Sequence, residues 1–201
     1  MNTIYKVAKL SLAIWIAAVP VAGWGQNGNV KTVGVGFAQS LLQSMVGDWS
    51  VSQRMWSATG AQPIELPRAL AHRRLLQGAV LQEEMTVAPG EKAEAFTRMA
   101  YFDYNPVASQ YEYFSIDSRA PQMMNERGYS EINKTGEALS LSGGIFVAPK
   151  WGNVANAAFR YRLVIGLVQQ NRQIVQLYLT PLSGEPGKEF LAFEYVYTEH
   201  P

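Results

Sequence analysis

Charged side chains within strand-like segments are the residues of this sequence best suited to binding chemistry. A charge that faces a dry core is costly unless it is paired, so each of these positions demands an explanation. In the segment 157–168, apolar residues alternate with Arg160 and Arg162, which favours an outward orientation for both arginines. If they point inward instead, they would anchor a carboxylate or phosphate head group. The charged positions are Arg98, Arg160, Arg162, Glu84, Glu112 and Glu194.

Tyrosines are numerous in the same strand-like segments. Tyrosine combines an apolar ring with a hydroxyl, which suits a cavity that holds a mostly apolar ligand with one or two polar groups. Strands also favour tyrosine on faces that bind nothing, so this alternative stays open. The candidate ligand-binding residues are Tyr101, Tyr113, Arg160, Arg162, Tyr178 and Tyr195.

Familiar catalytic and metal-binding patterns are missing from the sequence. It has no Gly-x-Ser-x-Gly, no phosphate-binding Gly-Lys-Ser/Thr and no dinucleotide glycine fingerprint. Glu83 and Glu84 are neighbours on a strand and point to opposite faces, so they cannot form an acid/base pair. The only histidines are His72 and His200, too few for a zinc site, and cysteine is absent. We therefore assign no catalytic residue, metal or cofactor; His72 is the one candidate for a haem ligand, although a surface position suits it better.

Residues 1–23 have the pattern of a secretory signal peptide. Lys6 and Lys9 precede an apolar run, and small residues precede a cleavage position after Gly23. The run is shorter than the ~20 residues that span a bilayer, which favours cleavage over a retained anchor. We therefore expect a periplasmic or secreted protein with no membrane span after cleavage.

Charge argues against nucleic acid as a partner. The formal net charge of the whole chain is +1, and removal of the two leader lysines makes it −1. Nucleic-acid binding needs concentrated lysine and arginine, and the sequence contains no basic cluster. A protein partner and a small-molecule ligand both remain compatible with this composition.

The rest of the chain divides into a lead-in, a helix and a series of strands. We expect a flexible lead-in over 24–36 and a single domain over 37–199, which begins with a short amphipathic helix ended by Gly47. Hydrophobic residues then alternate with period two. The predicted strands lie near 48–57, 68–76, 79–87, 95–104, 110–117, 122–131, 138–147, 157–168, 172–180 and 189–198.

About ten strands joined mostly by short turns favour an all-β, closed antiparallel up-and-down barrel. Closure removes exposed sheet edges, and a barrel of this size can hold one small ligand. A sandwich is the alternative fold, but its crossovers need longer connections than most of those present here.

Four sequence motifs carry a family resemblance. A helix leads into "MVGDW", followed by "RRLLQGAVLQEEM", "YFDYNPVASQYEYFSID" and a closing "FEYVYTE". Together they resemble the bacterial lipocalin-like family termed domain of unknown function fifteen-seventy-nine, over roughly residues 41–199. The resemblance implies a lipocalin-like barrel in the bacterial envelope or secreted, and no reaction. It also implies that Trp49 and Gly47 form a structural plug at the closed end, with Arg160 or Arg162 as the arginine packed on Trp49.

Three functional hypotheses follow. The first is an exported barrel that binds a small, mostly apolar ligand in its interior. The second is an envelope interaction module with a filled barrel, whose loops 58–67 and 181–188 contact a protein partner. The third is an enzyme that acts on a molecule held in the barrel. The inward face of 157–168, and a cavity of about 300 Å³ or more beside it, would discriminate among them.

Overall fold

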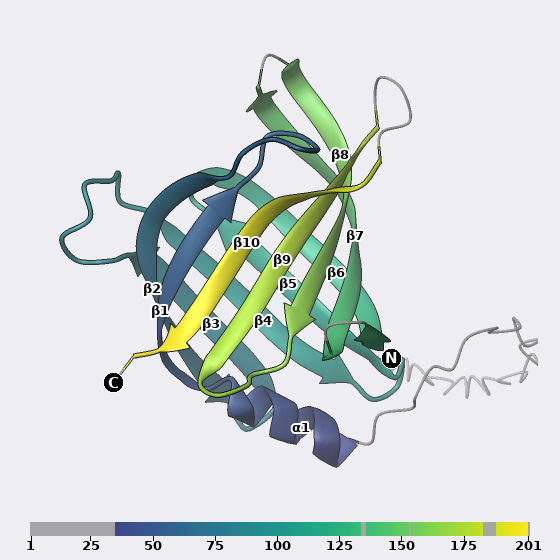
Figure 1. The fold of residues 1–201 in the computed structure, drawn as a ribbon. Helices are drawn as coiled ribbons and strands as arrows, with labels where there is room; N and C mark the ends of the chain where they lie inside the picture. The colour runs from purple at the N-terminus through teal and green to yellow at the C-terminus, as the bar shows by residue number, and fades with distance from the viewer. Residues whose placement is uncertain (1–34, 134–135, 153, 183–187, 201) are drawn as a thin grey trace, which may run out of the picture.

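The computed structural model describes residues 35–133, 136–152, 154–182 and 188–200, so the expected leader lies outside the described residues. One helix precedes ten strands (Figure 1). The elements are α1 (Val35–Ser44), β1 (Gly47–Met55), β2 (Ile64–Leu76), β3 (Val80–Val87), β4 (Thr97–Asn105), β5 (Gln110–Asp117), β6 (Ala120–Asn133), β7 (Gly136–Trp151), β8 (Val154–Gly166), β9 (Arg172–Pro181) and β10 (Phe190–Glu199).

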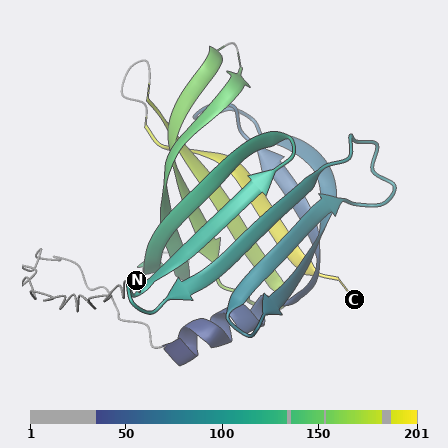
Figure 2. The ribbon, with the colours of Figure 1, turned by 180° about the vertical axis from the view of Figure 1, so that it is seen from behind.

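The ten strands form a closed antiparallel barrel, which confirms the predicted fold class. Each strand pairs with its neighbours in sequence, and β1 also pairs with β10 to complete the ring. Trp49, for example, lies opposite Ala71 on β2 and opposite Glu199 on β10. Figures 1 and 2 show the barrel from two sides, with the strands steeply tilted around a common interior. No sheet edge is left open between β1 and β10.

Helix α1 covers one end of the barrel (Figures 1 and 2). Its apolar residues recur at helical spacing, so Ala38, Leu41 and Leu42 are buried on one face. The helix begins at Val35, within the range expected for the lead-in. In the described part of the chain, no helix is long and apolar enough to cross a membrane.

Trp49 lies at this covered end and is 2% exposed. Its indole Nε1 donates a hydrogen bond to the backbone oxygen of Met45, 3.1 Å away, which joins β1 to the segment after α1. Gly47 has a φ of +140°, a conformation that side chains rarely adopt, and so permits the turn between them. The arginine beside the indole is Arg73 on β2, with Cζ 5.7 Å from the ring centre. The expectation of Arg160 or Arg162 in this place is therefore wrong.

Several strands extend beyond their predicted limits, β2 and β7 by the most. β2 begins at Ile64, so residues 64–67 of the expected loop 58–67 belong to a strand. Pro67 is accommodated because the pairing with β1 shifts register between Val51 and Gln53, and an irregular position tolerates a missing N–H. β7 continues to Trp151, and the β7–β8 hairpin projects beyond the barrel at the end away from α1 (Figure 1).

Candidate functional site

Three charged side chains lie inside the barrel on adjacent strands. Arg73 on β2 and Arg98 on β4 flank Glu83 on β3, and all three are buried. Arg73 Nε donates to Glu83 Oε2 at 2.7 Å, and Arg98 Nη1 donates to Glu83 Oε1 at 2.6 Å. The carboxylate of Glu83 thus forms ion pairs with two guanidinium groups, so each buried charge has a partner. We call Arg73, Glu83 and Arg98 the interior triad.

The triad holds its members in the charged state. Burial by itself raises the pKa of Glu83, but Arg73 and Arg98 together bring that pKa below its ordinary value. Burial likewise acts to lower the pKa of each arginine, but Glu83 and the neighbouring tyrosines raise both pKa values. All three groups are therefore ionised near neutral pH, and their charges sum to +1.

Arg73 closes the half of the barrel next to α1. Its Nη1 donates to Gln173 Oε1 at 2.6 Å, and its Cζ lies 3.9 Å from the ring centre of Tyr197. A cation over an aromatic face is stabilised by the ring electrons, so Tyr197 and Trp49 both contribute to the packing. The cavity in this half has a volume of only about 20 Å³. This end of the interior is filled by side chains.

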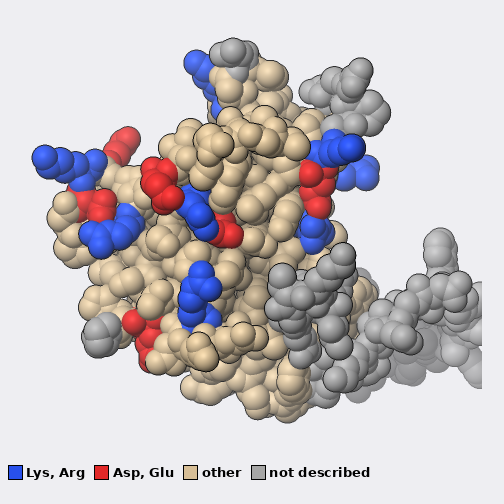
Figure 3. Space-filling view, in the orientation of Figure 1, with Lys and Arg blue, Asp and Glu red and all other residues tan. Residues whose placement is uncertain are grey.

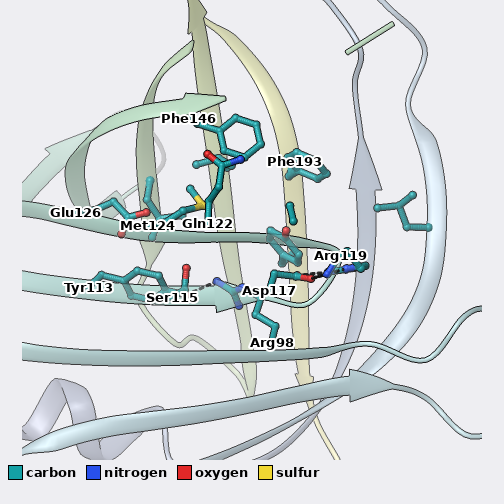
Figure 4. Close-up of a pocket in the computed structure, with 15 residues that line it drawn as sticks. Arg98, Tyr113, Ser115, Asp117, Arg119, Gln122, Met124, Glu126, Phe146 and Phe193 are labelled. Carbon is teal, nitrogen blue, oxygen red and sulfur yellow. Dashed lines mark hydrogen bonds and ion pairs between the residues drawn. The ribbon is translucent and has the colours of Figure 1, made fainter. Parts of the chain in front are cut away.

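A larger cavity of about 290 Å³ lies on the other side of Arg98, toward the end away from α1 (Figure 4). Its wall is mostly apolar, with a few polar groups that converge on it. The apolar members include Met124, Phe146, Leu163, Leu177 and Phe193, and the polar members include Arg98, Tyr113, Ser115, Glu126 and Tyr195. An apolar chamber with a small polar set is typical of small-molecule sites.

Glu126 on β6 is the most unusual polar group in the cavity wall. The residue is 1% exposed, and neither carboxylate oxygen has a hydrogen-bond partner among the described residues. Burial raises the pKa of Glu126 to about 8, although the charge of Arg98 acts in the opposite direction. The carboxyl group is therefore largely protonated at neutral pH and carries one O–H donor into the cavity.

Tyr113 lies in the cavity wall together with Arg98 and is hydrogen-bonded to it. Its hydroxyl accepts a hydrogen bond from Arg98 Nη2, and the residue lies opposite Glu126 in the pairing of β5 with β6. Burial raises the pKa of the Tyr113 hydroxyl despite the nearby charge of Arg98, so it remains protonated at neutral pH. Arg98, Tyr113 and Glu126 therefore form one polar cluster in the wall of a mostly apolar chamber.

An ion pair marks the turn between β5 and β6, at the end of the cavity away from α1. Arg119 donates to Asp117 through Nε at 2.9 Å and through Nη2 at 2.6 Å. Its Cζ also lies 3.6 Å from the ring centre of Phe96. Figure 4 shows both side chains beside the cavity, with their charges directed toward each other. The pair is neutral overall, so the net charge near the cavity is set by the interior triad and Glu126.

Two of the six predicted ligand-binding residues lie in the cavity wall, namely Tyr113 and Tyr195. The alternation of β5 turns Tyr113 inward. The alternation of β10 is interrupted by a register shift between Leu191 and Phe193, and Tyr195 beyond it lies in the cavity wall.

The other four predicted residues lie on the outer face, so they cannot contact a ligand inside the barrel. On β8, Tyr161, Leu163 and Ile165 are buried, which turns Arg160 and Arg162 outward, as the sequence alternation favoured. Arg162 donates to Glu189 at 2.9 and 2.6 Å and stacks over Tyr178, with Cζ 4.6 Å from the ring centre. Tyr101 accepts a hydrogen bond from Gln82 on the same outer face. Their inclusion as interior residues was therefore wrong.

The outer surface carries charges of both signs. On the face in Figure 3, lysines and arginines are interspersed with acidic residues among many uncharged ones, and the described residues there form no large area of one sign. His72 is also external: its Nδ1 is 2.6 Å from Asp48 Oδ1, and both side chains are exposed. No group of three or more potential metal ligands occurs among the described residues.

Sequence reasoning missed Arg73, Glu83 and Glu126 as interior groups. The signal was present, because each alternates in phase with apolar residues on its own strand. Glu83, for example, lies between Leu81 and Met85, both of which are buried. Period two alone places such a residue inward. The alternation along one strand does not identify the partner on the neighbouring strand that makes an inward charge acceptable.

A comparison with protein-family models matches residues 37–198 to the family described as protein of unknown function DUF1579. The chain belongs to the DUF1579 family. The matched region begins in α1 and ends in β10, so it contains the whole barrel, the interior triad and the cavity. A search of curated proteins gives no match. The family description assigns no activity, so the function of this DUF1579 barrel has to be argued from its site.

Proposed function

We propose that this DUF1579 protein binds a small, mostly apolar molecule inside its barrel. The observation that carries the proposal is the 290 Å³ cavity, with mostly apolar walls and a polar cluster, beside a barrel half whose own cavity is only about 20 Å³. A chain that folded only to present its surface would gain stability by filling this space, because an empty cavity forfeits packing contacts. The cavity therefore favours a binding role over the hypothesis of a filled barrel that contacts a protein partner.

Catalysis on the bound molecule is a second candidate function. Glu126 supports it, because a buried carboxyl group with a pKa near neutrality is the kind of group that enzymes use to transfer protons. Arg98 beside it would stabilise negative charge. Binding is the simpler proposal, since it needs no reacting partner for Glu126.

The binding proposal is tested with N-phenyl-1-naphthylamine, an uncharged probe whose fluorescence rises in apolar surroundings. We expect it to bind the wild-type protein and to bind the Ser115→Trp variant at least about tenfold more weakly. Ser115 is 4% exposed and lies in the cavity wall, so the indole would occupy much of the cavity. Ser50→Trp makes the same chemical change on the exposed outer face of β1 and serves as the control.

Circular dichroism and urea unfolding would verify that both variants fold. If Ser115→Trp does not fold, Leu177→Phe provides a smaller filling substitution at another wall position. Equal probe binding by the cavity variant and the surface variant would show that the probe binds elsewhere, and would contradict the proposal.

We also infer that the protein acts outside the cytoplasm, in the periplasm or as a secreted protein. The support is the signal-peptide pattern of residues 1–23, with its two lysines, its short apolar run and its small residues before Trp24. N-terminal sequencing of the protein isolated from its host should give a chain that starts at Trp24 or within a few residues of it. A chain that keeps residues 1–23 would contradict export with cleavage.

A further inference from the structure

We propose that the ligand is an apolar monoanion whose head group lies between Arg98, Tyr113 and Glu126 in the cavity wall. This inference rests on the proposed binding function and names the chemical class of the ligand. A medium-chain carboxylate is the simplest molecule of this class.

The charge inside the barrel favours an anionic ligand. The interior triad contains two cations and one anion, and each of its members is buried. Protonated Glu126 adds no charge, and the Asp117–Arg119 pair near the cavity end is neutral. Among the residues that the structure describes, one positive charge is therefore left without a counter-ion in a mostly apolar interior, where isolated charge is costly. A bound monoanion would neutralise it.

The hydrogen-bond donors around the cavity also favour an anionic ligand. A guanidinium group has five N–H donors, and the described bonds from Arg98 to Glu83 and Tyr113 use two of them. The Tyr113 hydroxyl accepts from Arg98, which leaves its own proton to donate. Protonated Glu126 offers a third donor, and its oxygens have no hydrogen-bond partner in the described part of the chain. Three converging donors match a carboxylate, whose two oxygens only accept hydrogen bonds.

A cationic head group fits less well. It would need ionised Glu126 as its counter-ion. The interior triad, ionised Glu126 and the bound cation would then carry a total charge of +1, whereas a bound anion beside protonated Glu126 brings the total to zero. The cation would also lie close to Arg98. A neutral alcohol could use the donors but would leave the excess charge uncompensated. The order of preference for one apolar chain is therefore anion, then alcohol, then amine.

Glu126 makes this preference depend on pH. The titratable groups around it are Arg98 from β4, whose charge lowers the pKa of Glu126, and Tyr113 from β5 and Tyr161 from β8, whose pKa values Glu126 raises. The pKa values of Arg98 and both tyrosines are raised, so Glu126 is the group that changes charge first as the pH rises. Above its pKa of about 8, Glu126 loses its donor and gains a negative charge that repels an anionic head group.

The test compares octanoate, octanol and octylamine by isothermal titration calorimetry with the full chain. At about pH 6 we expect octanoate to bind at least about tenfold more tightly than octanol, and octylamine to bind most weakly. Tightest binding by octylamine, or equal binding by octanoate and octanol, would overturn the inference. If N-phenyl-1-naphthylamine binds and octanoate does not, the inference fails while the binding function stands. If neither binds, the binding function itself fails.

The role of Glu126 is tested by repeating the titrations at about pH 10. We expect octanoate affinity to fall about tenfold in the wild type, whereas the affinity of uncharged octanol stays constant. Glu126→Gln keeps an N–H donor and cannot ionise, so its octanoate affinity should be nearly independent of pH. Glu84→Gln, on the exposed outer face of β3, should behave as the wild type. The same pH dependence in Glu126→Gln and in the wild type would overturn the proposed role.

Discussion

Replacement of Glu83 by glutamine is expected to lower the free energy of unfolding by about 3–5 kcal/mol at pH 7. The substitution preserves the shape of the side chain but removes the single carboxylate that both Arg73 and Arg98 contact. Two buried cations would then face each other without a counter-ion. Urea unfolding followed by tryptophan fluorescence and circular dichroism would measure the loss.

The matched control is Glu189→Gln, which breaks the pair of Glu189 with Arg162 on the outer face. There the side chains are 38% and 33% exposed, and such pairs contribute no more than about 1 kcal/mol. Similar losses for the two variants would show that the triad is no more important than a surface ion pair. Because the folded pKa of Glu83 is lowered, its contribution is present above the ordinary carboxyl pKa and is lost as the pH falls through the folded value.

Glu126→Gln is expected to change the pH dependence of stability in the opposite direction. The pKa of Glu126 rises from 4.5 to about 8 on folding, so the folded protein holds this proton more tightly than the unfolded chain does. Raising the pH between these two values therefore destabilises the wild type, by up to about 1.4 kcal/mol per pH unit. The glutamine side chain has no titratable proton, so the stability of this variant does not fall for this reason as the pH rises.

The measured quantity is the difference in unfolding free energy between Glu126→Gln and the wild type across the pH range. We expect it to move in favour of the variant by several kcal/mol between about pH 4.5 and pH 8, and to level off above. Glu84→Gln provides the comparison for an exposed carboxylate. Parallel pH curves for Glu126→Gln and the wild type would mean that Glu126 is ionised in the folded protein.

The architecture could be predicted from the sequence because its signals are local. β5 has the predicted limits, Gln110 to Asp117, since alternation and the flanking turn residues define both ends. The start of β2 was missed because Pro63 and Pro67 indicate a loop, whereas the register shift opposite Gln53 lets the strand continue through Pro67. The register shift depends on how β1 pairs with β2, and the sequence pattern along one strand does not predict this pairing.

The candidate site was harder to predict for the same reason. Arg160 and Arg162 are charges within a strand, but their position in the alternation of β8 places them on the outer face. Arg73 and Glu83 are acceptable inside because β2 and β3 pair them directly opposite each other. Glu126 has no hydrogen-bond partner among the described residues, so no pairing rule points to it. The empty space beside Glu126 depends on the side chains of several strands at once, so it emerges only from the folded barrel.

Native mass spectrometry of the protein isolated from its own host tests the central claim most directly. We predict a population in which one small molecule is bound to each chain, and release on denaturation should yield an apolar acid. Ser115→Trp, expressed in the same host, should carry none, whereas Ser50→Trp should carry the same molecule. A wild-type protein found only in its ligand-free mass, or the same bound mass in both tryptophan variants, would contradict a binding site inside the barrel.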